Sequence, residues 1–344
     1  MNYRFYTLLS ICFFFMVSVG NAKIFRVGYT GPQVTGTDYA DFQTAHDEAA
    51  TGDTLLFYPG NNYTGTASKS LVYMGYGYFL SGTEGNTGLQ LITGTLYLQI
   101  TLTAGSDGSH FEGIGDNTGQ TGQLYLIFSN GINNIVIRRC NYVLVYGSTS
   151  EDCTDWQIIQ SYNIDFIPYA NGNTGKFLNL RVENCHLTRL DFTNLTAGSN
   201  GQVSNCVIVG GVNLTGASIY FKNNIFQGAS FSGVAGTLFE NNLFDFTEGT
   251  YNITGGTDNQ FSVDMSNVFV GSTGNSTDGQ WQLKAGSPAI GAGTGSTDCG
   301  MFGGTNPYRL SGIPSIPVFY KLTAPSRTAT TNPYTITFSV KSNN

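Results

Sequence analysis

Val182-Glu-Asn-Cys-His-Leu187 is one of six similar hexapeptides that follow one another along the middle of the chain. The others are Ile137-Arg-Arg-Cys-Asn-Tyr142, Ile159-Gln-Ser-Tyr-Asn-Ile164, Val203-Ser-Asn-Cys-Val-Ile208, Phe221-Lys-Asn-Asn-Ile-Phe226 and Phe239-Glu-Asn-Asn-Leu-Phe244. Successive segments begin 22, 23, 21, 18 and 18 residues apart. A period of roughly 20 residues, with β-rich runs between Gly and Asn turns, is the length of one β-helix coil. The repeat predicts an all-β, single-stranded right-handed parallel β-helix.

Three columns emerge when the hexapeptides are aligned. The first position is apolar in every segment: Ile137, Ile159, Val182, Val203, Phe221 and Phe239. The last position is also apolar: Tyr142, Ile164, Leu187, Ile208, Phe226 and Phe244. Both columns are expected to point inward. The third position holds Asn184, Asn205, Asn223 and Asn241, which predicts a turn, because Asn tolerates left-handed backbone angles and its amide can bond to the same group one coil away. The leucine skeleton of a leucine-rich repeat and the six-residue register of a left-handed β-helix are both missing.

The first 22 residues have the features of a signal peptide. Arg4 precedes an apolar run from Thr7 to Val19, and small residues end the segment at Gly20-Asn-Ala22. The run is shorter than the roughly 20 residues that span a bilayer. We therefore expect a protein that is secreted or displayed at the cell surface, without a membrane span.

The charge balance limits the classes of partner. Without Arg4, 14 basic residues face 22 acidic ones, and binding to nucleic acid or anionic lipid needs clustered Lys and Arg. Charged residues make up only 11% of the chain, whereas glycine alone contributes 45 residues. This composition suits sheets and tight turns. The excess of acidic residues makes nucleic acid and anionic lipid poor partners.

Both ends of the repeat region differ from its middle. Tyr39 to Ala50 is predicted to form a short amphipathic helix that caps the N-terminal end of the stack. We expect a signal peptide at 1–22, the β-helix at 23–304, and a Pro-spaced extension with a terminal strand at 305–344. In that strand Tyr334, Ile336, Phe338 and Val340 alternate with polar residues. It is expected to pack along the side or end of the helix; the alternative is docking of a partner, or of a second copy, by strand addition.

Several motifs resemble those of known proteins. The passage Asp41-Phe-Gln-Thr-Ala-His-Asp-Glu-Ala-Ala-Thr-Gly-Asp-Thr-Leu-Leu-Phe-Tyr-Pro-Gly60 is similar to the entry segment of pectate-lyase-like β-helix proteins. Gly75-Tyr-Gly-Tyr-Phe-Leu80, Gly105-Ser-Asp-Gly-Ser109, Ser287-Pro-Ala-Ile-Gly-Ala-Gly293 and Asp298-Cys-Gly-Met-Phe-Gly-Gly304 resemble elements of a bacterial family of secreted β-helix proteins without an assigned activity. The resemblance implies fold and secretion. It implies no single function, because this fold serves lyases, hydrolases, epimerases, phage tailspikes and adhesins.

A polysaccharide lyase or glycoside hydrolase would need acids and bases gathered on neighbouring coils. The catalytic candidates are Arg138, Arg139, Glu183, His186, Arg189 and Asp191. Glu183 lies in a column with Arg138, Lys222 and Glu240, where alternating charges are explained by a solvated ladder. His186 is expected to be a packed or turn-facing histidine. Cys185 and Cys206 share a column on adjacent coils, and stacked buried thiols are favoured there over a disulfide.

Carbohydrate contact is the remaining functional possibility. Tyr73, Tyr76 and Tyr78 cluster in an irregular coil, where their rings could stack on sugars or close the core. No cofactor or metal site is predicted; calcium is an alternative at acidic turns such as Gly105-Ser-Asp-Gly-Ser109, Gly115-Asp-Asn-Thr-Gly119 and Ser276-Thr-Asp-Gly279. The sequence favours a binding or structural module for glycans or envelope components. The alternatives are a polysaccharide lyase or hydrolase, and an assembly subunit joined through the C-terminal strand.

Overall fold

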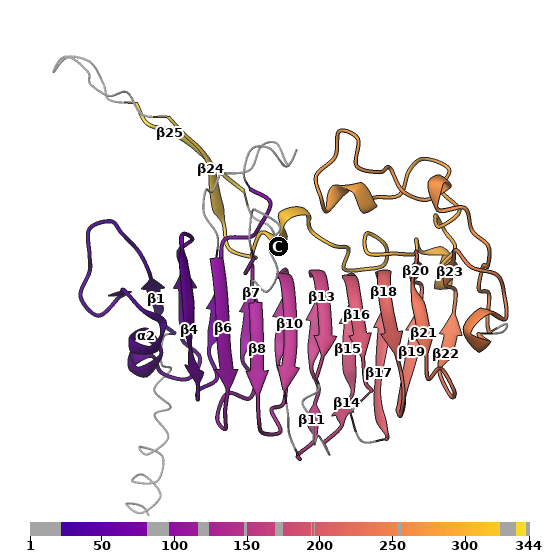
Figure 1. The fold of residues 1–344 in the computed structure, drawn as a ribbon. Coiled ribbons are helices and arrows are strands. Elements are labelled where there is room, and N and C mark those ends of the chain that lie inside the picture. The colour runs from indigo at the N-terminus through magenta and orange to yellow at the C-terminus, as the bar shows by residue number, and fades with distance from the viewer. Residues whose placement is uncertain are drawn as a thin grey trace, which may run out of the picture.

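The fold is a parallel β-helix, as the repeat predicts. A computed structural model describes residues 22–80, 96–115, 124–147, 150–168, 175–193, 195, 197–253, 256–323 and 335–341; the expected signal peptide lies outside these residues except for Ala22. Two large parallel sheets run the length of the stack (Figure 1). We name the eleven-stranded one sheet A and the ten-stranded one sheet B.

From β3 onward each coil contributes one strand to each sheet, except that the coil after β19 gives sheet B both β20 and β21. In spatial order, sheet A contains β2 (Asp38–Tyr39), β1 (Ile24–Val27), β3 (Thr54–Phe57), β5 (Val72–Met74), β7 (His110–Glu112), β9 (Val136–Arg138), β12 (Gln157–Ile159), β15 (Leu180–Glu183), β17 (Ser199–Ser204), β19 (Ala217–Lys222) and β22 (Leu238–Glu240). Sheet B contains β4 (Asn61–Ala67), β6 (Leu96–Leu102), β8 (Leu124–Phe128), β10 (Asn141–Gly147), β13 (Tyr162–Ile167), β16 (His186–Asp191), β18 (Val207–Asn213), β20 (Ile225–Phe226) and β23 (Leu243–Phe244), with β21 (Ser230–Ser232) beside β18. The short strands β11 (Cys153–Thr154) and β14 (Phe177–Leu178) pair separately.

The apolar columns form one continuous core between the sheets. Equivalent rings stack from coil to coil, as Phe226 does on Phe244 with ring centroids 4.8 Å apart. Two predicted positions were wrong by one residue: Ile158, not Ile159, pairs with Ile137, and Val143, not Tyr142, pairs with Ile164. The cause is a bulge, because the coils through β10 and β13 carry one extra residue, Tyr142 and Asn163, at the start of the sheet B strand.

The predicted asparagine turns join sheet A to sheet B. Asn184, Asn205, Asn223 and Asn241 all have φ between 50° and 57°, the left-handed region that Asn tolerates better than most residues. Their side chains do not bond to one another, so the expected coil-to-coil ladder at this position was wrong. They point away from the core and bind the backbone of a C-terminal segment.

We call residues 292–315 the C-terminal strap. It runs back along the turns in the reverse order of the coils. From the last coil towards the first, side-chain to strap contacts include Asn241 with Ala292 O, Asn223 with Thr294 N, Asn205 with Asp298 O, Asn184 with Met301 O and Gly303 O, Gln160 with Asn306 O and Pro307 O, and Arg139 with Ile313 O. The turn side chains thus satisfy backbone groups of a segment that has no sheet partner of its own.

An asparagine ladder does exist one position further along each coil, inside the molecule. Asn224 Nδ2 donates to Asn242 Oδ1, and Asn242 Nδ2 donates to Asn259 Oδ1, both at 3.0 Å. Asn224 and Asn242 are fully buried. Earlier coils place Cys140, Ser161, Cys185 and Cys206 in the same column. The expectation that Cys185 and Cys206 are stacked, buried thiols is confirmed, because none of the five cysteines in the described part of the chain forms a disulfide and all five are buried.

Short helices and a hairpin complete the chain. The helix α2 (Phe42–Glu48) begins at Asp41, whose carboxylate accepts the Thr44 amide, and it buries Phe42, Ala45 and His46 against the first coils. The 3₁₀ turns are η1 (Thr250–Asn252), η2 (Met265–Asn267), η3 (Gly279–Trp281), η4 (Thr294–Ser296) and η5 (Leu310–Gly312).

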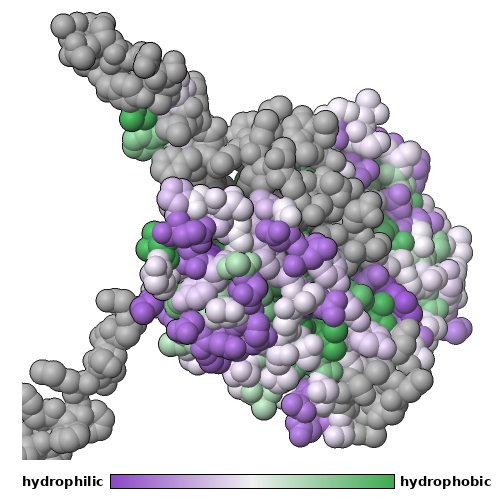
Figure 2. Space-filling model, turned by 60° about the vertical axis from the view of Figure 1, so that its left-hand side comes forward, coloured by the Kyte–Doolittle hydropathy of each residue, from purple (hydrophilic) through white to green (hydrophobic). Residues whose placement is uncertain are grey.

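On the face turned forward in Figure 2, hydrophobic residues form only small, separate groups. None of the described helices is long and apolar enough to cross a membrane.

The C-terminal strand takes a different place from the one expected. β25 (Thr337–Lys341) pairs antiparallel with β24 (Val318–Thr323), and the resulting hairpin projects from the solenoid (Figure 1). Ile336, Phe338 and Val340 are 52%, 60% and 43% exposed. The apolar face therefore does not pack along the side or end of the helix, because the strand's backbone pairs with its own upstream segment instead.

Candidate functional site

Arg139, one of the catalytic candidates, has a structural role. Its side chain is fully buried beneath the strap, where Nη1 donates to Ile313 O at 3.0 Å and lies 3.6 Å from the Glu112 carboxylate. Glu112 in turn accepts both the backbone amide and the hydroxyl of Ser315. Burial lowers the pKa of Arg139 to about 10. This arginine anchors the strap and presents no surface to a substrate.

His186 is a packed histidine, as expected. Its ring stacks on Tyr162 with centroids 4.5 Å apart and lies 4.8 Å from the Trp281 ring. Complete burial lowers its pKa to about 3, because an imidazolium would lose its hydration there. A buried histidine with so low a pKa is a poor general base.

The remaining charged candidates are divided between the two sheets. Arg181 bonds to Glu183 at 2.6 Å on sheet A, whereas Arg189 bonds to Asp191 at 2.8 Å on sheet B. On sheet A, Lys222 lies 3.2 Å from Glu240, which matches the expected alternating ladder. Arg138 donates to Gln160 Oε1 at 3.3 Å in the turn between the sheets. The structure does not bring these residues into one catalytic cluster.

Two of the three candidate tyrosines are core residues, so their predicted role in carbohydrate contact was wrong. Tyr73 points inward and stacks on Phe111 at 4.7 Å. Tyr78 is buried beneath the strap, and its hydroxyl lies 2.7 Å from that of Tyr308. Only Tyr76 reaches the surface; it is half-buried, with its ring edge against Tyr58 at 5.2 Å.

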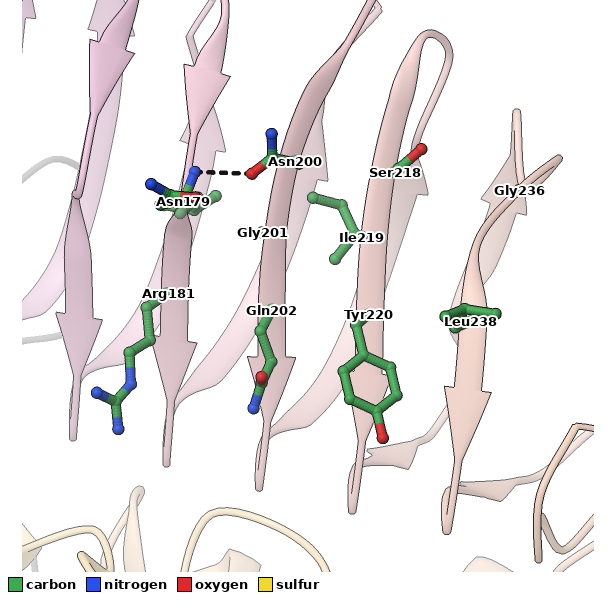
Figure 3. Close-up of a pocket in the computed structure, with 11 residues that line it drawn as sticks. Asn179, Arg181, Asn200, Gly201, Gln202, Ser218, Ile219, Tyr220, Gly236 and Leu238 are labelled. Carbon is green, nitrogen blue, oxygen red and sulfur yellow. Dashed lines mark hydrogen bonds between the residues drawn. The ribbon is translucent and has the colours of Figure 1, made fainter.

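The first candidate site is a groove on the outer face of sheet A (Figure 3). One wall consists of Arg181, Gln202, Tyr220 and Leu238, which occupy the same position on β15, β17, β19 and β22. The other wall consists of Asn179, Asn200, Ser218 and Gly236. The residues between the walls, Leu180, Gly201 and Ile219, lie in a column of side chains directed towards the core, so backbone forms much of the floor.

The dimensions of the groove follow from sheet geometry. Residues two apart on a strand are roughly 7 Å apart, and neighbouring strands are roughly 4.8 Å apart. The groove therefore runs across the strands, parallel to the solenoid axis, and encloses about 390 Å³. Polar side chains recur on three successive strands, β15, β17 and β19, at a spacing comparable to the length of one sugar ring, whereas the coil of β22 contributes Leu238 and Gly236.

The wall side chains are held in place by local bonds. The Asn179 amide N donates to Asn200 Oδ1 at 2.9 Å, which fixes the orientation of that side chain. The Tyr220 hydroxyl bonds to Glu240, and burial together with this carboxylate raises the pKa of Tyr220 to about 12. Arg181 remains half-exposed despite its bond to Glu183. Ordered planar groups of this kind offer hydrogen bonds and one aromatic face at little entropic cost.

The described lining of the groove contains amides, hydroxyls, a guanidinium and aliphatic groups, but no carboxylate or imidazole. A pair of carboxyl groups, which glycoside hydrolysis requires, is therefore missing from that lining. The sequence did contain a signal for the groove: residues immediately before the inward Val182, Val203 and Phe221 must point outward, and they are Arg181, Gln202 and Tyr220.

In the acidic turns that the structure describes, the aspartate carboxylates accept hydrogen bonds from other groups of the protein. Asp107 accepts the backbone amide of Asn133, and the buried Asp278 accepts from Tyr308 and Ser311. Most of the third turn, at 115–119, lies outside the described residues. Within the described part of the chain, no three His, Cys, Asp or Glu side chains are grouped as metal ligands.

Comparison with known proteins adds no assignment. No protein-family model matches the sequence, and no curated protein matches it significantly.

Proposed function

We propose that this protein is an extracellular binding module that holds a linear, uncharged polysaccharide in the sheet A groove. The carrying observation is the recurrence of hydrogen-bonding side chains along the groove at the strand spacing. A polymer lying along the solenoid axis would meet hydrogen-bonding side chains at successive sugars along β15, β17 and β19. Secretion or surface display, and membership of the bacterial β-helix family, belong to the same proposal and rest on the sequence motifs.

The chemistry of the groove favours uncharged sugars. The amides of Asn200 and Gln202 can both donate to and accept from hydroxyl groups, and the Tyr220 ring can pack against the apolar face of a sugar. The one positive charge in the lining, Arg181, is largely compensated by Glu183. A uronate polymer would need more unpaired cations than these walls supply.

A binding screen tests the proposal. The protein would be titrated against neutral linear polysaccharides (mannan, xylan and soluble β-glucan) and against polygalacturonate and alginate. We expect at least one neutral polymer to bind, and Tyr220→Ala to weaken it about five- to tenfold, the equivalent of about 1 kcal/mol of lost ring contact. Tyr220→Phe, which keeps the ring, should bind like the wild type.

Gln202→Ala should also weaken binding, whereas Gln157→Ala provides its matched control. Gln157 occupies the same column two strands away but does not line the groove. Equal affinities for the Gln202 and Gln157 variants would contradict the groove assignment. Release of reducing ends or unsaturated products, abolished by the same groove substitutions, would instead establish the lyase or hydrolase alternative.

The C-terminal hairpin carries a second candidate function, assembly. Its strand β25 exposes Ile336 and Val340 in a two-stranded ribbon, and exposed apolar strand faces are typical of interaction surfaces. Ile336→Asp with Val340→Asp would separate the two functions. Loss of self-association in sedimentation experiments, with polysaccharide binding unchanged, is the result that favours an assembly subunit.

A further inference from the structure

A second hollow, on the outer face of sheet B, contains a concentration of tyrosines. Tyr97 on β6, Tyr125 on β8 and Tyr142 on β10 come from three successive strands and line a space of about 620 Å³. All three side chains are half-buried. Their neighbours along each strand, such as Leu98, Leu124 and Val143, are the residues that fill the core. Packing of the core therefore does not require these rings.

The backbone is deformed where the hollow is built. Tyr142 and Asn163 are the extra residues in the coils through β10 and β13, and both have left-handed backbone angles, with φ of 52° and 51°. Both side chains line the hollow. Asn adopts this conformation readily, whereas a bulky tyrosine does so at a cost in free energy. Bulges of this kind redirect side chains, and they concentrate near functional sites.

Polar groups lie beside the rings. The Asp165 carboxylate accepts the Thr188 hydroxyl at 2.6 Å, and both residues line the hollow. The Tyr97 hydroxyl donates to Gln99 Oε1 at 2.9 Å. Asp165 retains acceptor capacity beyond the single bond from Thr188. The hollow thus combines aromatic faces with an amide and a carboxylate, a lining that suits the apolar faces and hydroxyl groups of neutral sugars and repels acidic ones.

We propose that this tyrosine hollow is a second glycan site, which binds a short stretch or end of a neutral polysaccharide. The outer faces of sheets A and B point away from their shared core, so one chain in the groove and another in the hollow would occupy separate surfaces. One molecule then bridges two polysaccharide chains. The bridging step rests on the proposed function of the groove; the hollow itself does not.

Substitutions that respect the backbone test the hollow. Tyr142→Gly and Asn163→Gly remove the side chains while keeping left-handed positions that glycine adopts freely. Tyr125→Ala removes a ring, and Tyr125→Phe is its matched control because it keeps one. Each full-length variant would first be compared with the wild type by circular dichroism, thermal melting and sedimentation, so that unfolding and self-association are recognised.

The readout is agglutination of beads coated with mannan, xylan or β-glucan, together with binding of short oligosaccharides of the same polymers followed by NMR. Tyr125→Ala and Tyr142→Gly should require at least tenfold more protein to agglutinate the beads and should lose oligosaccharide contacts at the hollow. Binding of the long polymer through the groove should persist in both. Tyr125→Phe should agglutinate like the wild type.

The outcomes separate the two sites. If Tyr125→Ala and Tyr142→Gly agglutinate beads and bind oligosaccharides as the wild type does, the hollow is not a glycan site, and the groove proposal stands. If Tyr220→Ala leaves polymer binding unchanged while the hollow variants abolish it, the groove proposal and the bridging both fail, and the hollow is the single glycan site.

Discussion

Replacement of Asn184 tests how the strap and the solenoid depend on each other. Asn184 is 4% exposed, has φ of 52°, and donates from Nδ2 to Met301 O at 3.0 Å and to Gly303 O at 2.7 Å. Asn184→Gly removes both hydrogen bonds but keeps the left-handed backbone. Asn184→Ala removes the same bonds and also places a Cβ in a conformation that disfavours it.

The two variants should differ by a calculable amount. Each lost bond costs about 1 kcal/mol, so Asn184→Gly should lower the free energy of unfolding by about 2 kcal/mol. The left-handed conformation adds roughly 1 kcal/mol for alanine, which brings Asn184→Ala to about 3 kcal/mol. Urea titrations followed by tryptophan fluorescence and circular dichroism would measure both values, since Trp156 lies in the core and Trp281, at the end of η3, packs on the His186 ring.

Asn179 provides the matched control. It has φ of 58° but is exposed, and its side chain makes only a surface bond of 3.2 Å to Asp155. Asn179→Gly should therefore be nearly neutral, whereas Asn179→Ala should lose roughly 1 kcal/mol. If Asn184→Gly were as stable as the wild type, the strap bonds would contribute nothing. Equal stabilities for Asn184→Ala and Asn184→Gly would refute the backbone argument.

Three further predictions concern buried groups. Burial lowers the pKa of His186 to about 3, below the value of about 6.5 in the unfolded chain. Its contribution to stability is therefore complete above pH 6.5 and is lost progressively as the pH falls towards 3. Denaturant titrations should find about 2 kcal/mol lost by pH 5, and His186→Phe should show a smaller loss. Burial raises the pKa of Cys153 to about 11 and of Cys299 to about 12, so these thiols should react with a disulfide reagent at pH 8 only after unfolding; rapid reaction of the native protein would show that they are accessible. Asn242 makes four side-chain hydrogen bonds in the inner ladder, and Asn242→Ala should lower the melting temperature more than Asn184→Ala does, because the groups it leaves without partners are more deeply buried.

The sequence predicted the architecture because the signal repeats. Inward columns, left-handed asparagines and the charge ladder each recur coil after coil, so one misaligned residue does not hide them. The error at Ile159 and Tyr142 arose where two coils gained an extra residue. A bulge adds one residue to a coil but leaves its pattern of apolar and polar residues intact, so an alignment of hexapeptides of equal length does not reveal the extra residue.

The candidate sites were less accessible to prediction than the fold. The groove depends on residues such as Gln202 and Tyr220, which carry no carboxylate, imidazole or amine and belong to no catalytic motif. The hollow depends on Tyr142, whose outward position results from a bulge. Tyr73 and Tyr78 looked suitable for sugar contact because they lie in a Gly-rich coil. Coil register buries Tyr73 against Phe111, whereas Tyr78 is buried by the strap, whose Tyr308 lies 230 positions later.

The two asparagines of each Asn-Asn pair have separate tasks, and this division explains why the solenoid and its C-terminal region form one unit. Asn223 and Asn241 face outward and bind the strap, whereas Asn224 and Asn242 face inward and bond to the coils on either side. The inner ladder fixes the spacing of the coils. Because the outward asparagines are spaced by the same coil-to-coil distance, the strap can bind successive coils only while they remain stacked. Loosening of any coil should therefore release the strap locally, and loss of the strap should uncover Tyr162 and Tyr78, whose side chains now lie against Tyr308.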